Sequence, residues 1–132
     1  MNTKRFILAA IVVFITLQVT DYIIHNLILS GTYESLMNIW RADMMGKMWV
    51  MQLASLFFSF MFVFIFTKNY EGNGVSEGIR YGLLIGLLMS VMGNLSQYSV
   101  YPLPFSLVLQ WFFYGMIQFI LAGAVASLVY KQ

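Results

Sequence analysis

Apolar positions run along this chain in four long stretches, and polar positions gather in the short segments between them. The apolar stretches cover residues 6–29, 48–67, 77–98 and 105–130. An α-helix needs about 20 consecutive apolar residues to cross the hydrocarbon core of a bilayer, and each stretch meets that length. The pattern predicts an all-α membrane protein, a single transmembrane domain over residues 1–132 whose four helices form an antiparallel bundle.

The segment between the first two spans, residues 32–47, has a different pattern. Apolar side chains recur there at spacings of three and four, while polar side chains fall on the other side. This periodicity predicts a short amphipathic helix lying in the membrane interface. We expect the segment to cap the bundle, with Glu34, Trp40 and Arg41 over its end, because an indole ring favours the interface. Arg41 either reaches Asp21, which would keep that carboxylate ionised, or extends to a lipid phosphate.

Small residues mark the faces on which the last two spans can pack. Gly78, Gly82 and Gly86 are four residues apart in the third span, and Gly123 belongs to a similar stripe in the fourth. Small residues at this spacing let two helix backbones approach closely. The sequence therefore predicts tight packing of the third span against another span of the chain. The short connection Tyr101-Pro102-Leu103-Pro104 separately makes the third and fourth spans antiparallel neighbours.

Composition agrees with a membrane protein. Apolar residues make up 61% of the chain and charged residues only 9%, whereas a soluble domain carries about 25% charged residues. The chain contains no cysteine, which excludes disulfides and thiolate metal sites. A net charge of +2 gives no reason to expect a nucleic-acid partner. The expected partner is the lipid bilayer, with other membrane subunits or a second copy of the chain as open alternatives.

The basic residues predict how the bundle is oriented. Five of the seven fall on the side that holds both termini and the middle loop, namely Lys4, Arg5, Lys68, Arg80 and Lys131. Only Arg41 and Lys47 fall on the other side. Because cytoplasmic loops carry an excess of Lys and Arg, we expect both termini to be cytoplasmic.

Asp21 is the most informative residue for function. It lies inside the first apolar span, where an ionisable group costs several kcal/mol unless it has a partner. His25 follows at i+4 and Gln18 precedes at i−3, so these side chains share one face of the helix. Asn26 lies beside them. Since lipid offers no hydrogen bonds, this face is expected to turn inward.

With the predicted orientation, all four spans place polar side chains in the outer half of the membrane. The set comprises Gln18, Asp21, His25, Asn26, Gln52, Asn94, Gln97, Tyr98, Gln110 and Tyr114. One interpretation is a hydrogen-bond network that fixes helix register. The other is a pocket that opens outward and binds a small ligand or cation, in transport or sensing. A structural accessory subunit of a larger membrane complex is the alternative class of function.

Methionines give a further alternative. Met44, Met45, Met48 and Met51 lie near the outer end of the second span, and thioethers are soft ligands that select copper(I). Copper handling with His25 is therefore an open alternative, although methionine serves most often as adaptable apolar filler. Sequence motifs of hydrolytic or phosphate-binding sites are absent. We expect a protein that is not an enzyme in its own right and needs no cofactor.

Several short motifs carry a resemblance to a known group of proteins. They are Asp21-Tyr22-Ile23-Ile24-His25, Trp40-Arg41-Ala42-Asp43-Met44, Lys47-Met48-Trp49 and Glu77-Gly78-Ile79-Arg80-Tyr81-Gly82. In their order, the chain resembles small four-span bacterial inner-membrane proteins that are classed as domains of unknown function. The resemblance implies a bacterial source and a multi-pass location in the inner membrane. It implies no activity and no functional residue.

Overall fold

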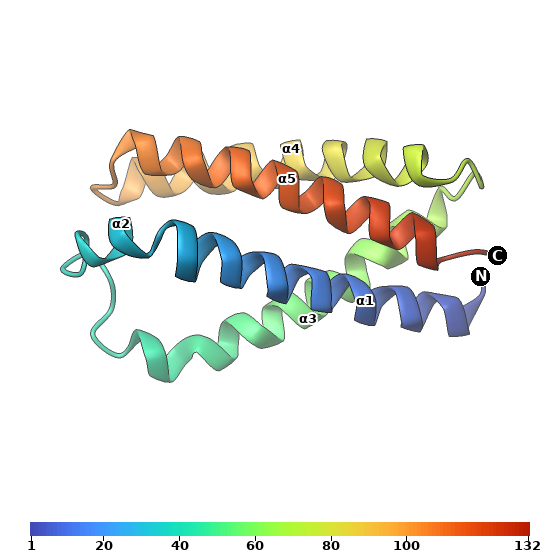
Figure 1. Cartoon of the computed structure of the whole chain (residues 1–132), viewed down its shortest axis with the longest axis horizontal. Coiled ribbons are helices and arrows are strands. Elements are labelled where there is room, and N and C mark those ends of the chain that lie inside the picture. Colours follow the sequence, from blue (N-terminus) through green and yellow to red (C-terminus); the bar gives the residue numbers. More distant parts are fainter.

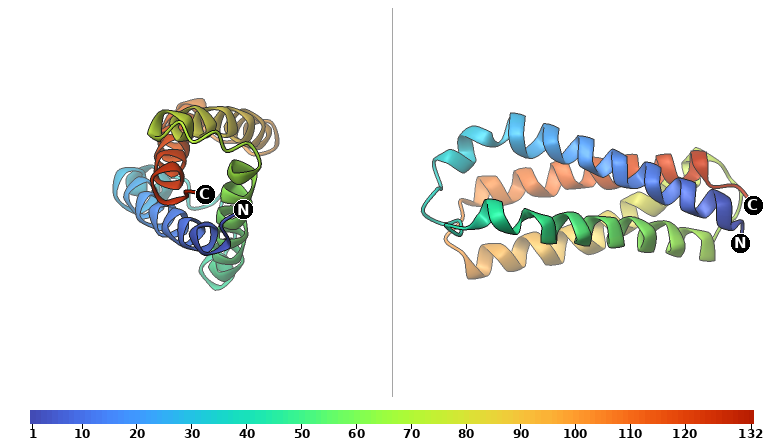
Figure 2. Two further views of the ribbon diagram at one scale, coloured as in Figure 1. Left: turned by 90° about the vertical axis from the view of Figure 1, so that its right-hand side faces the viewer. Right: turned by 90° about the horizontal axis from the view of Figure 1, so that it is seen from below.

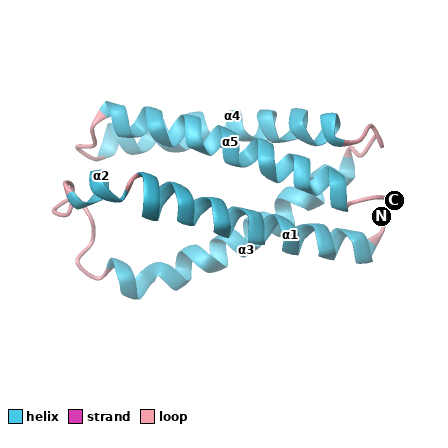
Figure 3. Cartoon of the chain, in the orientation of Figure 1, coloured by secondary structure: helices cyan, strands magenta, loops and turns pink.

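The computed structural model describes all residues 1–132, and its regular structure is entirely helical (Figure 3). The elements are α1 (Thr3–Asp21), a π-helix (Tyr22–Ile28), α2 (Ser30–Glu34), a 3-10 helix (Met44–Lys47), α3 (Met48–Lys68), α4 (Val75–Val100) and α5 (Phe105–Val129). Four helical stretches are long and apolar enough to cross a membrane: Thr3–Ile28, Met44–Lys68, Val75–Val100 and Phe105–Val129. The predicted fold class, an all-α bundle of four potential transmembrane helices, is confirmed.

The four long helices run up and down in turn, so both termini lie at the same end of the bundle (Figure 1). We call this the terminal end and the opposite one the loop end. Seen along its length, the bundle is four-sided, in the order α1, α3, α4, α5 (Figure 2). The most extensive pairing is between α4 and α5, and α1 packs against both α5 and α3.

The α4–α5 pair owes its closeness to glycine. A Cβ added to Gly78 would lie 2.1 Å from the carbonyl oxygen of Gly123, and one added to Gly82 would lie 2.3 Å from that of Phe119. Real Cβ atoms do not approach backbone this closely, so these positions admit no side chain. Gly86 is less tight, because its added Cβ would meet side-chain atoms no nearer than 3.0 Å. In the structure, the glycines of the third span therefore lie directly against the fourth.

Aromatic side chains fill the interior at the terminal end. Phe62 and Phe66 of α3 are each 2% exposed and pack on Tyr81 of α4, with ring centroids 4.8 and 5.4 Å away. The Tyr81 hydroxyl also donates a hydrogen bond to the carbonyl of Phe62. Tyr130, which follows α5, is fully buried against Phe66. Large rings thus connect α3 to α4 in this half of the bundle.

The loop between α3 and α4 is organised by a buried carboxylate. Glu77, in the first turn of α4, accepts hydrogen bonds from the backbone N–H groups of Glu71 at 2.7 Å and Asn73 at 2.9 Å. Gly72 and Gly74 adopt positive φ angles of 75° and 79°, which suit glycine. The helix therefore begins at Val75, two residues before the predicted start of the span.

The predicted amphipathic helix over residues 32–47 is wrong. Its first residues belong to the end of α2 and its last four form the 3-10 helix Met44–Lys47. Between these two pieces the chain makes successive turns, with i→i−3 bonds such as Ile39 N–H to Leu36 O at 2.9 Å. The Trp40 indole N–H donates to the Tyr33 carbonyl at 3.3 Å, which satisfies a carbonyl at the end of α2 and folds the chain back. A helix this short is marginal, and the tertiary contact prevails over its periodicity.

Packing loosens from the terminal end toward the loop end. Every residue from 49 to 54 of α3 is exposed, and so are residues 95–100 of α4. Figure 1 shows the first turns of α3 diverging from the α4–α5 pair. The candidate site lies in this looser half, on the α1–α5 side.

Candidate functional site

The site is built around a change of helix type in the first span. α1 ends at Asp21, and the chain continues as a π-helix through His25, closing with Leu29 N–H to Ile24 O at 2.9 Å. Single π-helical segments inside membrane-length helices are frequent at functional sites. The i, i+4 spacing still leaves the Asp21 Oδ1 and His25 Nε2 atoms 4.0 Å apart.

Gln118 of α5 holds the Asp21 carboxylate. Its Nε2 donates to Asp21 Oδ1 at 2.7 Å and to Thr20 Oγ1 at 2.8 Å, and lies 3.3 Å from the Leu17 carbonyl oxygen. The Thr20 hydroxyl donates its own hydrogen bond to the Thr16 carbonyl at 2.8 Å, so its oxygen is free to accept one from Gln118. A lone amide in the middle of an apolar span was the available sequence signal for Gln118, which was not among the predicted site residues.

His25 is joined to the loop and to α5 through Tyr33. The Nδ1 atom of His25 lies 2.6 Å from the Tyr33 hydroxyl, and the Trp111 indole N–H donates to the same hydroxyl at 2.7 Å. Since an indole can only donate, the hydroxyl accepts from Trp111 and has its own proton free for Nδ1. This arrangement assigns neutral His25 the tautomer with its proton on Nε2, on the side of Asp21.

Tyr33 is suited to act as a neutral link. Burial raises the pKa of its phenol above the usual value of 10.0; the hydrogen bond from Trp111 lowers it by less, and the Asp21 carboxylate raises it further. The hydroxyl therefore keeps its proton over the physiological range. Tyr33 belongs to the segment 32–47 but was not among the predicted site residues, and neither was Trp111, because their meeting depends on how the loop folds back.

The loop does cover this end of α1 and α5, but only its apolar residues take part. Ile24, Leu29, Leu103, Leu107 and Val108 form a buried cluster, against which Tyr33, Leu36, Ile39, Trp40, Trp111 and Tyr114 pack. Trp40 meets Tyr33 edge-on, with ring centroids 5.7 Å apart. Of the three residues predicted for the cap, Trp40 therefore contacts the loop-end core.

Glu34 and Arg41 are exposed and take no part in the cap. Arg41 pairs with Asp43, with Nε to Oδ1 at 2.9 Å and Nη2 to Oδ2 at 3.3 Å. This bond lowers the pKa of the Asp43 carboxyl. The alternative in which Arg41 reaches Asp21 is wrong, because a carboxylate two residues away in the same turn competes for the guanidinium.

The ten predicted polar residues do not line one pocket. Asp21 and His25 come together, Tyr114 packs nearby, and Gln18 turns to α3, where its Nε2 lies 3.4 Å from Ser55 Oγ. Asn94 is half-buried in a groove of about 200 Å³ between α4 and α5. The remaining five are exposed: Asn26, Gln52, Gln97, Tyr98 and Gln110. Because α3 diverges from the α4–α5 pair at the loop end, polar residues at the same depth in the membrane lie far apart.

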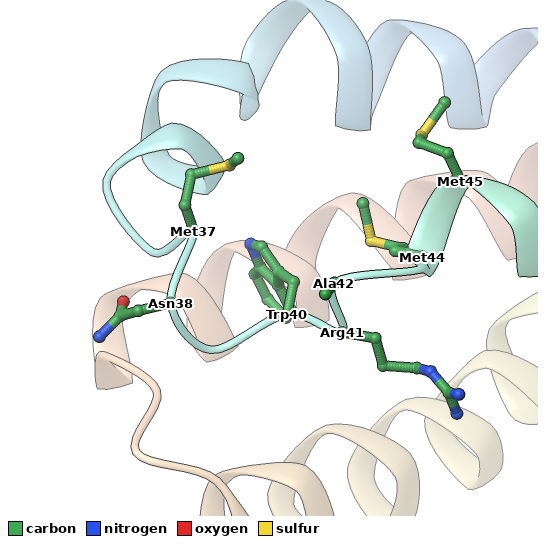
Figure 4. A pocket seen from close by; sticks show the side chains of 7 residues that line it. All are labelled: Met37, Asn38, Trp40, Arg41, Ala42, Met44 and Met45. Atoms are coloured by element: carbon green, nitrogen blue, oxygen red, sulfur yellow. The ribbon is translucent and has the colours of Figure 1, made fainter.

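The predicted methionine cluster is also divided. A pocket of about 280 Å³ in the loop is lined by Met37, Asn38, Trp40, Arg41, Ala42, Met44 and Met45 (Figure 4). The Arg41 side chain points away from Met44 and Met45 in this view. Met48 and Met51 lie in α3 instead, and His25 is not in the pocket wall. No group of three or more His, Asp or Glu side chains is close enough to hold a metal ion.

Comparison of the chain with protein-family models, with curated proteins and with solved structures finds no match. The resemblance to four-span proteins of unknown function stays a prediction. The geometry around Asp21 is what bears on function.

Proposed function

We propose that this polytopic membrane protein binds a small ligand or cation at Asp21, in transport or sensing. The observation that carries the proposal is a carboxylate within a membrane-length helix that has no cationic group in contact. Its nearest basic atom is His25 Nε2, 4.0 Å from Oδ1. An ionised carboxylate in a bilayer costs several kcal/mol unless it is paired, so a cationic ligand would relieve that cost.

The carboxylate also has unused capacity to bind. Oδ1 accepts from Gln118, while Oδ2 makes no hydrogen bond within the chain, and the Asp21 side chain is 42% exposed. An exposed carboxylate oxygen without a partner in the chain is free to pair with a cation or to accept a hydrogen bond from a ligand. This free oxygen supports a binding role.

Binding is favoured over catalysis by the residues beside Asp21. The neighbouring groups are one imidazole, one amide, one phenol and one hydroxyl, from His25, Gln118, Tyr33 and Thr20. They can hold a ligand or move a proton, but they include no activated nucleophile and no set of donors aimed at a developing oxyanion. We therefore propose that the protein is not an enzyme in its own right.

For the membrane orientation, we propose cytoplasmic termini in a bacterial inner membrane. The positive-inside rule supports the orientation, since the terminal end carries five of the seven basic residues. The resemblance of the sequence motifs supports the bacterial source. In this orientation Asp21 and His25 belong to the outer half of the membrane.

The test compares Asp21→Asn with Asp43→Asn, the same chemical change at an exposed loop carboxylate. Native mass spectrometry of detergent-purified protein reports retained small molecules, and thermal unfolding reports stabilisation by added ligands or cations. We expect Asp21→Asn to lose the retained species or the stabilisation while Asp43→Asn behaves as the parent. Equal behaviour of all three proteins would refute a binding role for Asp21.

A structural accessory subunit is the second candidate, favoured by a different observation. Residues 49–54 of α3 are exposed on all sides, and Gln52, Gln97 and Gln110 expose amides on membrane-length helices. Amides hydrogen-bond across helices in membranes, so a neighbouring subunit would satisfy them. Co-purification with other chains in fixed stoichiometry from mild detergent would favour this function.

A further inference from the structure

The basic side chains at the terminal end of the bundle have no acidic partners. All of them are exposed, and none forms an ion pair: Lys4, Arg5, Lys68, Arg80 and Lys131. The two ion pairs of the chain, His25–Asp21 and Arg41–Asp43, both lie in the other half of the molecule. Positive charge therefore stays exposed and unpaired at the terminal end.

The two carboxylates at this end are already in use. Glu77 is buried and accepts hydrogen bonds from the backbone N–H groups of Glu71 at 2.7 Å and Asn73 at 2.9 Å. The Glu71 carboxylate accepts from the Asn73 side-chain amide at 2.9 Å. Both acids thus stabilise the α3–α4 loop, and the anions that balance the basic side chains come from outside the chain.

Three of the basic residues meet where α1 begins and α5 ends. Arg5 Nη1 lies 3.5 Å from the carbonyl oxygen of Val129, the last residue of α5. Lys4 precedes Arg5 in the first turn of α1, and Lys131 follows Val129 by two residues. Figures 1 and 2 show the two termini side by side at this end. The contact with one carbonyl leaves most N–H groups of the Arg5 guanidinium free.

The other two basic residues lie apart from this group. Lys68, at the end of α3, has its Nζ 4.8 Å from the ring centroid of Phe64, a cation–π arrangement. Arg80 belongs to α4, which lies diagonally across the bundle from α1 (Figure 2). The concentrated charge is therefore at the junction of α1 and α5.

Exposed apolar side chains continue from this junction toward the membrane. Leu8 follows Lys4 at i+4 and Arg5 at i+3, so it lies beside both on the helix surface. Leu8 is 46% exposed, Ile11 in the next turn is 44% exposed, and Leu128 near the end of α5 is 61% exposed. A cationic rim above an apolar surface matches a phospholipid, in which a headgroup phosphate is followed by acyl chains.

We propose that Lys4, Arg5 and Lys131 form a docking surface for the headgroup of an anionic phospholipid. The planar guanidinium matches two phosphate oxygens, and the two ammonium groups add point charges. A zwitterionic headgroup supplies its own cation, so three unpaired cations favour a headgroup with net negative charge. The apolar surface favours a lipid over a free phosphate ion, because acyl chains cover it. This surface is separate from Asp21, which lies toward the loop end.

The test measures lipid binding to the full chain in detergent, where orientation in a membrane plays no part. Native mass spectrometry counts bound phosphatidylglycerol, with phosphatidylcholine of the same acyl chains as the control headgroup. We expect phosphatidylglycerol to bind the parent at least about tenfold more tightly. This preference should weaken as the ammonium acetate concentration rises, because salt screens exposed charges.

Two double variants of equal net charge make the assignment specific. Lys4→Gln/Lys131→Gln removes two charges whose side chains make no hydrogen bond or ion pair within the chain. Arg41→Gln/Lys47→Gln removes two charges from the loop end. The first should lower the affinity for phosphatidylglycerol by roughly tenfold or more, since each basic residue near anionic lipid contributes about fivefold. The second should bind phosphatidylglycerol as the parent does.

Single variants test the role of the guanidinium. Arg5→Gln should also lower the affinity for phosphatidylglycerol, and Arg5→Lys should restore only part of it, because an ammonium keeps the charge but loses the planar fork. Thermal unfolding checks that each variant is folded. If Arg5→Gln fails to fold, Lys4→Gln/Lys131→Gln decides the point.

Three results would overturn the proposal. Equal binding of the two lipids to the parent would show that headgroup charge is not recognised. Equal losses in the two double variants would make the effect one of net charge and not of this surface. If inorganic phosphate at the same concentration displaces phosphatidylglycerol from the parent, the surface binds a free anion and the lipid is the wrong occupant. Ligand binding at Asp21 is unaffected by any of these results.

Discussion

At the residue scale, the Tyr33 hydroxyl connects the loop to two spans through hydrogen bonds. Its oxygen accepts a hydrogen bond from the Trp111 indole N–H and lies beside His25 Nδ1, so three elements meet at one oxygen. Removing such an atom leaves a donor without an acceptor, which costs more than the bond itself contributes. The hydroxyl is therefore a sensitive point for stability.

We predict that Tyr33→Phe lowers the free energy of unfolding by about 1–3 kcal/mol, because the Trp111 indole N–H loses its acceptor. Trp111→Phe should cost less from the hydrogen bond alone, since the Tyr33 hydroxyl keeps His25 as a partner. Thermal or denaturant unfolding in detergent measures both. Tyr101→Phe is the matched control, because Tyr101 is 53% exposed. An effect of Tyr33→Phe no greater than the control would contradict the link.

The pH dependence of the same pair follows from the phenol. Burial holds the pKa of Tyr33 above 10.0 in the folded state. As the pH rises through 10, the unfolded chain therefore loses this proton first, and the folded state loses stability relative to it. The alkaline loss should be smaller in Tyr33→Phe than in the parent.

Individual residues of the site were predictable only where local spacing decides their position. Asp21 and His25 are four residues apart on one helix, and that alone predicts that they share a face. Gln118 and Trp111 come from the last span, and which of its faces meets α1 depends on packing over the whole bundle. For this reason the sequence did not predict Gln118 and Trp111 as partners of Asp21 and Tyr33.

At the element scale, the helices were predictable to within a few residues, because membrane-length apolar runs leave few alternatives. The exception is the segment 32–47, where an apolar period of three and four was satisfied by turns instead of a helix. Its apolar residues still found a buried cluster. The periodicity predicted correctly that these side chains would be buried, but it did not predict the backbone conformation of the segment.

The glycines of α4 give a graded prediction. Gly82→Ala should destabilise the bundle by about 3 kcal/mol or more, because its Cβ would lie 2.3 Å from a backbone oxygen that cannot move aside. Gly86→Ala should cost less, since its nearest contact, Phe119 Cβ, is 3.0 Å away and the next, the Met116 thioether, can shift. Gly93→Ala meets nothing within 4 Å and should stabilise the helix by about 0.5–1 kcal/mol.

Thermal unfolding of the three variants in one detergent measures this order. All three make the same chemical change on the same helix, so differences between them report packing alone. If Gly93→Ala were as damaging as Gly82→Ala, the close approach of α4 to α5 would not be the source of the effect.

At the scale of the whole molecule, the bundle has two unlike ends. Aromatic rings and glycine contacts fill the terminal end, whereas the loop end diverges and contains the polar groups around Asp21. The sequence predicted that polar side chains of all four spans would lie at one depth in the membrane. Side chains at the same depth still lie apart when their helices diverge, as they do at the loop end. The tight end can hold the fold, while the loose end contains the polar groups on which the proposed binding rests.

The last prediction concerns which end faces the cytoplasm. Since the chain has no cysteine, Asn38→Cys in the loop-end segment and Asn69→Cys in the α3–α4 loop each introduce a single thiol at an exposed position. The excess of basic residues at the terminal end should keep that end inside. In whole bacterial cells, a membrane-impermeant maleimide should label Asn38→Cys at once and Asn69→Cys only after permeabilisation. The reverse pattern would put Asp21 and His25 in the inner half of the membrane.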